Sequence, residues 1–217
     1  MPYYPSHIKL IRKNNKGSRD FYDIFVQDFH LKPISEIKWE RDLQFNYRNI
    51  DKWWENVNSI IHKGLSDCKL KWLQYRIIHR IIGTNDLLCK MGLHADGLCS
   101  FCNRSPETII HLFYYCPYSE RLWNDIHNWL QFSIGLDVDF SLSNVIFGIT
   151  GTKFNRINIF ICLVKSYIYA QKLKVAKPSL DGVKILISKY IKIDKYIHRK
   201  NLKLEQFERK WDMLTRI

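Results

Sequence analysis

The chain has 217 residues, of which 46% are hydrophobic and 14% aromatic, so it is long enough to bury a core and too apolar for a disordered protein. Its formal net charge is +13, and the excess lies almost entirely in residues 153–217. This distribution favours a polyanionic partner, most simply RNA or DNA, over a basic surface that only keeps the protein soluble. The N-terminus lacks a secretory apolar stretch and the most apolar run, 157–164, is too short to span a bilayer, so we expect an intracellular protein of the nucleus or cytoplasm with no membrane partner.

The first part of the chain predicts short helices separated by turns. Ser18 is expected to cap a helix over 19–29, and Pro33 breaks the chain before a second helix that opens at Ser35. Asp51 is expected to cap a third helix, which ends at Gly64.

Residues 68–82 carry the clearest helical pattern, with Asp67 as the expected cap and Gly83 as the expected end. The apolar residues of this segment recur at the helical period and form one stripe: Leu70, Leu73, Ile77 and Ile81. Basic residues occupy a neighbouring stripe: Lys69, Arg76 and Arg80. Thr84 is then expected to begin a short helix that Gly92 stops.

Three cysteines and a histidine follow in the pattern Cys99-x2-Cys102-x8-His111-x4-Cys116. Two residues between cysteines let both thiolates meet one ion from a tight turn, and three thiolates with one imidazole suit tetrahedral Zn²⁺. Four protein ligands leave no open position, so we expect a structural zinc site. The alternative is that all four residues are ordinary core residues, but a histidine and a third cysteine at this spacing favour metal over chance.

A helix is expected to begin at Ser105-Pro106-Glu107 and to run toward Cys116. Residues five apart on a regular α-helix lie about 140° apart around the axis, which would separate His111 from Cys116. We expect Pro117 to distort the chain at Cys116 and to let the thiolate return to the ion.

The remaining chain predicts further helices over 118–132, 154–175 and 179–215, with a looser stretch at 135–151. Cys68, Cys89 and Cys162 stand singly in apolar patterns and are expected in the core. A strand hairpin is considered only at the metal knuckle. The predicted fold is mostly α: a helical module with an embedded CCHC zinc knuckle and a long basic C-terminal helical region.

The segment 69–130, with its motifs CSFC, ETIIHLF and a later Trp, resembles the zinc-binding region of reverse transcriptases from LINE-type (non-LTR) retrotransposons. Similarity is most specific over 68–130 and extends over 35–215, through KWERDL, KSYIYAQK and FERKW. Residues 1–34 resemble the connector after the polymerase. We therefore divide the chain into a connector segment (1–34), a helical zinc-binding domain (35–150) and a basic helical region (151–217).

The resemblance implies that Cys99, Cys102, His111 and Cys116 hold zinc, and that the module binds RNA or DNA in support of target-primed reverse transcription. It also implies the polymerase part of such a polyprotein as a partner. A polymerase needs paired carboxylates, and no Asp-Asp dipeptide occurs in the chain, so we expect no enzymatic activity. The chain is expected to be a C-terminal fragment or a truncated copy of such an element.

The candidate nucleic-acid contacts are basic residues beside the knuckle and on the C-terminal region: Lys69, Lys71, Arg76, Arg80, Arg104, Lys189, Lys192, Lys195, Arg199, Lys200 and Lys203. Interleaved aromatic rings are candidates for stacking on bases, with core packing as the alternative: Trp72, Tyr75 and His79.

Two other functions are considered. The first is an interaction scaffold with purely structural zinc, which docks on the polymerase or another protein through tryptophans: Trp53, Trp54, Trp123 and Trp129. The second is a nuclease that uses Asp181, Glu205 or Glu208, but no recognisable spacing supports it.

Overall fold

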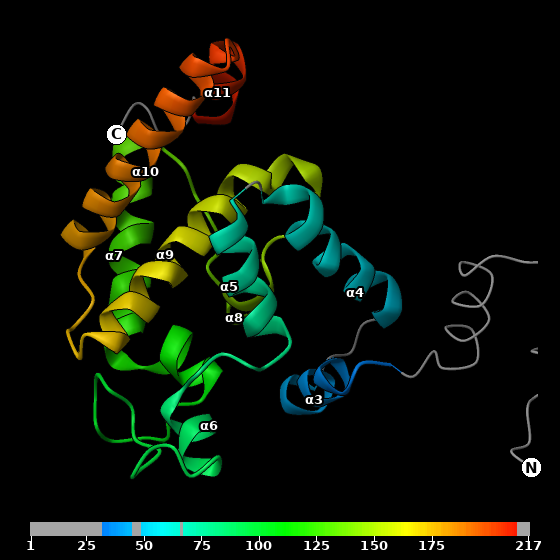
Figure 1. Cartoon of the computed structure of the whole chain (residues 1–217), viewed down its shortest axis with the longest axis vertical. Helices are drawn as coiled ribbons and strands as arrows, with labels where there is room; N and C mark the ends of the chain where they lie inside the picture. Colours follow the sequence, from blue (N-terminus) through cyan, green and yellow to red (C-terminus); the bar gives the residue numbers. More distant parts are fainter. Residues whose placement is uncertain (1–31, 45–48, 66, 212–217) are drawn as a thin grey trace, which may run out of the picture. The chain divides into compact units, whose positions relative to one another are not determined.

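The computed structural model describes residues 32–44, 49–65 and 67–211 (Figure 1). The helix expected after Ser18, most of the predicted connector 1–34, and the end of the last predicted helix lie outside these residues. The chain divides into two compact units, Met1–Gln44 and Phe45–Ile217, and each is described by itself. The three-part division at 34 and 150 stays a prediction.

The first unit contributes helix α3 (Ile34–Leu43), which begins directly after Pro33 as the sequence predicts, within one residue. It ends at Gln44, whose φ of 48° lies in the left-handed region. A left-handed residue after the last turn is a common way for a helix to stop.

The described part of the second unit is mostly helical, which confirms the mostly α prediction. Its elements are α4 (Ile50–Ser59), η1 (Ile60–Gly64), α5 (Cys68–Ile78), α6 (Asn85–Lys90), η2 (His111–Tyr115), α7 (Pro117–Ile134), α8 (Leu142–Phe147), η3 (Thr152–Phe154), α9 (Asn155–Leu173), α10 (Leu180–Lys200) and α11 (Leu204–Trp211). The one β-type pairing among the described residues is an antiparallel bridge between Leu98 and Pro106. No helix in these ranges has the length and apolar character needed to cross a membrane.

Helix α9 is the centre of this unit. Its residues from Ile157 to Lys165 are all buried. Most of them are apolar on every side of the helix, which is typical of a helix enclosed in a core. Helices α5 and α10 and the π-helical turn η1 pack against it, and α11 packs on α10 (Figure 1). The continuous apolar run in the sequence therefore corresponds to a helix enclosed by its neighbours.

Two predicted helix caps are confirmed. The Asp67 carboxylate accepts hydrogen bonds from the backbone N–H of Lys69 at 2.7 Å and of Leu70 at 3.3 Å, at the start of α5. The Thr84 hydroxyl accepts one from the N–H of Leu87 at 3.4 Å, at the start of α6. These side chains satisfy donors that the first turn of a helix leaves free.

The end predicted for α5 at Gly83 is wrong. The helix stops at Ile78, and Arg80 takes a left-handed φ of 59°. The N–H of Arg80 bonds to the carbonyl of Ile77, and that of Ile81 bonds to the carbonyl of Arg76. This pair of bonds is a Schellman motif, which closes a helix without requiring glycine. Ile81 is consequently exposed and leaves the predicted apolar stripe.

Other differences are local. Asn49 rather than Asp51 caps α4, since its side chain accepts from the N–H of Lys52 at 3.0 Å. The stretch predicted to be loose contains the short buried helix α8. Of the single cysteines expected in the core, Cys162 is buried, Cys89 is half-buried and Cys68 is exposed, so the prediction is wrong for Cys68.

Candidate metal centre and basic surfaces

The four predicted metal ligands come together in the folded chain. Their ligand atoms, from Cys99, Cys102, His111 and Cys116, all lie within 4.8 Å of one another. Cys99 and Cys116 are fully buried, whereas Cys102 and His111 lie at the edge of the cluster and are partly exposed. No other group of at least three Cys, His, Asp or Glu side chains among the described residues could hold a metal in this way.

The spacing of these atoms fits a tetrahedral zinc ion. Two thiolates that each lie about 2.3 Å from zinc at the tetrahedral angle are about 3.8 Å apart. The Sγ atoms of Cys99 and Cys116 are 3.7 Å apart, and the Sγ atom of Cys102 lies 3.3 Å from Nε2 of His111. Three sulfurs and one imidazole nitrogen are also the donor set that zinc prefers.

The first two ligands sit on a tight turn that the backbone holds closed. The N–H of Cys99 bonds to the carbonyl of Ser105, and the N–H of Asn103 bonds to the carbonyl of Cys99, both at 2.9 Å. Asn103 adopts a left-handed φ of 52°, which asparagine tolerates better than most residues. The N–H of Phe101 points at Sγ of Cys99 at 3.5 Å. The hairpin considered at the knuckle is therefore reduced to this turn and the single bridge beside it.

The last two ligands converge through a π-helical turn. The N–H of Cys116 bonds to the carbonyl of His111 at 2.7 Å, five residues back, and residues His111–Tyr115 form η2. An i→i+5 bond closes one turn between these residues, so their side chains emerge on the same side. The predicted distortion is thus present, but it occupies the whole turn before Cys116 rather than Cys116 alone.

The predicted start of this helix at Ser105 and Pro106 is wrong. Pro106 takes part in the bridge with Leu98, and the hydroxyl of Thr108 accepts a hydrogen bond from the N–H of His111 at 3.1 Å. The cap therefore lies three residues later than expected. The reason is Glu107, whose side chain is buried in the interior instead of lying exposed on the first turn of the helix.

The thiols influence one another strongly. The hydrogen bond with Cys116, and then burial, raise the pKa of Cys99 to about 12. The same hydrogen bond lowers the pKa of Cys116, and backbone N–H groups of Tyr118 and Ser119 at the start of α7 act in the same direction. A helix N-terminus also favours a thiolate, so the start of α7 supports the anionic form of Cys116.

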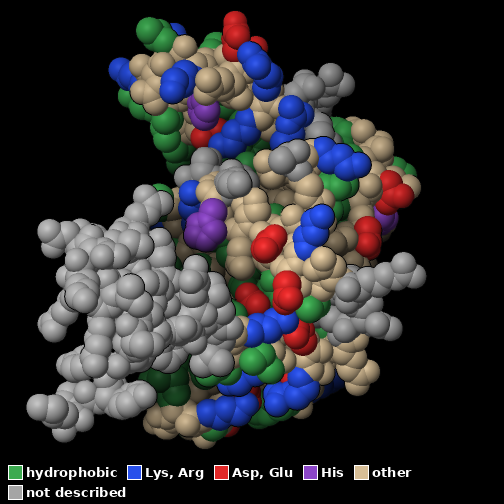
Figure 2. Space-filling model, turned by 90° about the vertical axis from the view of Figure 1, so that its right-hand side faces the viewer, with side chains coloured by type: hydrophobic (Ala, Val, Ile, Leu, Met, Phe, Trp, Pro, Cys, Tyr) green, Lys and Arg blue, Asp and Glu red, His purple; other side chains and the backbone are tan. Residues whose placement is uncertain are grey.

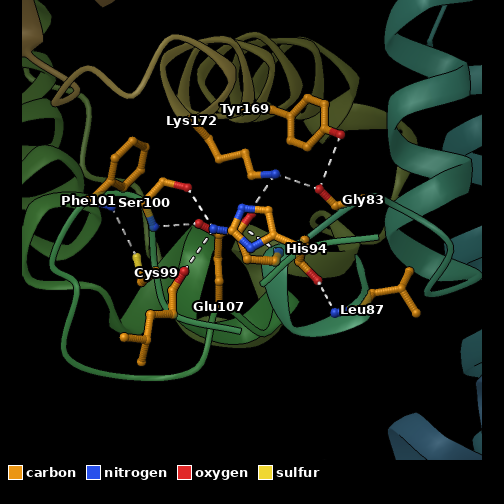
Figure 3. Close-up of polar contacts among 12 residues, drawn as sticks. Gly83, Leu87, His94, Cys99, Ser100, Phe101, Glu107, Tyr169 and Lys172 are labelled. Carbon is orange, nitrogen blue, oxygen red and sulfur yellow. Dashed lines mark hydrogen bonds and ion pairs between the residues drawn. The ribbon is translucent and has the colours of Figure 1, made fainter. Parts of the chain in front are cut away.

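A buried polar network joins the knuckle to the rest of the second unit (Figure 3). The Glu107 carboxylate has no exposed surface, and its oxygens accept from the N–H of Asn85 at 2.9 Å and of Ser100 at 2.8 Å. The Lys172 ammonium lies 3.5 Å from the same carboxylate and donates to the carbonyl of Gly83 at 2.8 Å. Ser100 lies between the first two ligands, so one carboxylate connects the knuckle, α6 and α9.

Sequence reasoning missed Glu107, Asn85 and Lys172 as parts of this site. Glu107 falls inside the ETIIHLF motif, which was a signal that it matters, but its partner Lys172 lies far along the chain. Only the packing of α9 brings the two together.

The predicted basic contacts lie on three separate elements. Lys69 on α5 and Arg104 in the knuckle loop are exposed, as are the predicted residues of α10 and the turn after it: Lys189, Lys192, Lys195, Arg199, Lys200 and Lys203. Figure 2 shows Lys and Arg side chains gathered at its upper end, where α10 and α11 lie, with mixed charges below.

Three of the predicted basic side chains, on α5 or just after it, are only partly exposed. Lys71 donates to the carbonyl of His62 at 3.2 Å. The guanidinium of Arg76 lies 5.5 Å from the centre of the Tyr169 ring, and Arg80 stands at the left-handed end of α5. These three are half-buried, so they are weaker candidates for phosphate than Lys69.

The aromatic candidates divide sharply. Trp72 is 58% exposed, so core packing is wrong for this residue. Trp54 and Trp123, by contrast, are buried, and the indole N–H of Trp123 donates to the carbonyl of Phe113 at 2.8 Å. The Trp53 ring packs edge-to-face against the rings of Trp54 and Phe147. The tryptophans proposed for a docking scaffold therefore serve mainly in internal packing.

A cavity of about 600 Å³ opens between the start of α5, the start of α9, and helices α10 and α11. It contains residues of both charges, including Asp67, Arg156, Asp194 and Lys210. Asp194 accepts from Lys210 and from the indole N–H of Trp211, which fastens α11 onto α10. Because groups of both charges line it, the cavity favours neither an anionic nor a cationic ligand.

No curated protein matches this chain. Residues 39–123 match the family model described as zinc-binding in reverse transcriptase. All four clustered ligands and Glu107 lie inside this matched segment. Residues 39–123 are therefore similar to the region that binds zinc in reverse transcriptases.

Proposed function

We propose that the chain is a non-catalytic nucleic-acid-binding module whose zinc ion is structural, and that it acts downstream of the polymerase in a LINE-type reverse transcriptase. The observation that carries this proposal is the convergence of three thiols and one imidazole within 4.8 Å, inside a segment that matches reverse transcriptase zinc-binding regions. Four protein ligands complete the shell of zinc and leave no site for a reactive water.

The zinc would fasten the CSFC turn to the start of α7, because its ligands come from both. The hydrogen bonds and ion pair of Glu107 would then hold α6 and α9 against the ordered knuckle. Exposed cations on α5, the knuckle loop and α10 would hold the phosphate backbone of RNA or DNA during target-primed reverse transcription.

The zinc part of the proposal predicts about one zinc per chain by mass spectrometry of the purified protein. Cys99→Ser and His111→Ala should each remove the metal and reduce helical content measured by circular dichroism, since ligand binding contributes folding energy. Cys68→Ser is the matched control, because Cys68 is exposed and outside the cluster. A folded protein without zinc would contradict the metal assignment.

The nucleic-acid part predicts binding that weakens steeply as salt rises, because each phosphate contact releases counterions. Replacing Lys192 and Lys195 together by alanine should reduce the slope of log affinity against log salt by about 1.4–1.8. Lys174→Ala removes an exposed lysine that is not a predicted contact and should leave the slope unchanged. Affinity that is indifferent to salt would instead favour the docking scaffold.

A further inference from the structure

Helix α5 carries a strip of aromatic rings on its outer face. Trp72, Tyr75 and His79 are spaced i, i+3 and i+7, which places them on one side of the helix. Trp72 is 58% and Tyr75 36% exposed, whereas residues on the opposite side, such as Leu73 and Ile77, are buried against the core. Trp72 and Tyr75 are therefore turned away from the interior of their unit, and the half-buried His79 lies at the end of the strip.

The rings of this strip are already ordered against one another. Trp72 and Tyr75 stack with 5.4 Å between ring centres and only 8° between ring planes. Tyr75 and His79 follow at 4.1 Å, tilted by 41°. Burial lowers the pKa of His79, so at neutral pH its ring adds stacking surface rather than charge.

Positive charge borders the strip. Lys69 is exposed on α5 one turn before Trp72, whereas the guanidinium of Arg76 faces Tyr169 within the protein. The sequence of α5, CKLKWLQYRII, contains no acidic residue. Aromatic rings next to an exposed lysine match a nucleic-acid strand, whose bases stack on the rings and whose phosphates attract the ammonium group. A protein partner would not need this charge.

We propose that the strip formed by Trp72, Tyr75 and His79 is a stacking platform for the bases of a single-stranded nucleic acid, with the exposed Lys69 on its phosphates. This inference rests on the proposed function and narrows it. In a duplex the base faces are hidden between neighbouring pairs, so only an unpaired strand offers them to the rings. The strip extends about 10 Å along the helix axis, enough for two or three bases.

The test uses the zinc-loaded full chain and three fluorescent probes of equal length: oligo(dT), oligo(U) and a mixed-sequence duplex. Trp72→Ala should weaken binding of the single strands about 10-fold and leave duplex binding unchanged. Trp72→Phe, which keeps a ring, should restore most of the loss. Phe132→Ala is the matched control, since Phe132 is an aromatic residue of α7 with 89% exposure. Comparison of the dT and U probes shows whether DNA or RNA is the better ligand.

The outcomes separate the platform from the general function. If the unaltered protein binds no probe, the proposed function fails and the platform with it. Should it bind while Trp72→Ala binds single strands equally well, the platform is overturned and the basic surface stands, which leaves the strip to a protein partner. Equal losses on single strands and duplex would also overturn stacking, because base faces are accessible in only one of them.

Discussion

At the scale of single residues, Lys165 is the least expected group in the interior. It lies in the middle of α9 with no exposed surface, and its ammonium donates to the side-chain oxygen of Gln74 and to the carbonyl of Ile146. Burial lowers its pKa from 10.5 to about 8. Burial also raises the pKa of Cys162, one turn away.

The substitution Lys165→Met should raise the free energy of unfolding at pH 7 by about 1–3 kcal/mol, because an apolar side chain of similar length replaces a buried charge. Between pH 8 and 10.5 the unfolded chain keeps a proton that the folded chain has released, so stability of the unaltered protein rises with pH there. The raised pKa of Cys162 acts in the opposite sense above 9.0, which makes pH 8–9 the informative window.

Urea unfolding across this window measures the effect. The unaltered protein should gain stability from pH 8 to 9 relative to Lys165→Met, while the exposed control Lys174→Met should follow the unaltered protein. Parallel curves for the unaltered protein and Lys165→Met would contradict the lowered pKa.

At the scale of elements, the knuckle and α9 depend on one carboxylate. Replacing Glu107 by Gln keeps the shape but turns an amide N–H₂ toward a backbone donor and leaves Lys172 buried without its counter-charge. We expect a loss of about 3–5 kcal/mol in the free energy of unfolding, as for other broken buried pairs. The zinc should also be removed by chelator at lower concentration, since Ser100 beside the ligands loses its acceptor.

Chemical denaturation and chelator titration measure these two losses. Glu120→Gln is the matched control, because Glu120 is an exposed acid in the first turn of α7. A Glu107→Gln protein as stable as this control would show that the ion pair contributes nothing.

At the same scale, the elements show what local sequence could and could not predict. Asp67 and Thr84 were predictable as caps because a cap needs only its own side chain and the next three residues. Ser105 and Pro106 have the same local signal, yet the helix begins later because Glu107 is drawn inward by partners on other elements. Arg80 ends α5 in a conformation usually given to glycine, so no residue type marked that end.

At the scale of the whole molecule, some features were likewise predictable from local sequence and others were not. The mostly α fold and the clustering of the four metal ligands followed from periodicity and spacing within short windows. The position of Lys172, the exposure of Trp72 and the burial of Trp54 depend on which helices pack together, and no short window contains that information. The π-helical turn was predictable only in part. The spacing of His111 and Cys116 required a distorted helix, but it did not specify that the distortion is a π-helical turn.

The two sets of contacts at the knuckle also differ in how far they reach along the chain. The four ligands lie between residues 99 and 116, whereas Glu107 and Lys172 are 65 residues apart along the chain. Closing a short loop loses less chain entropy than closing a long one, and local contacts generally form earlier in folding. The knuckle is therefore expected to close around its ion early in folding, before α9 packs against it. The ion pair between Lys172 and Glu107 then forms last and stabilises a knuckle that zinc binding has already ordered.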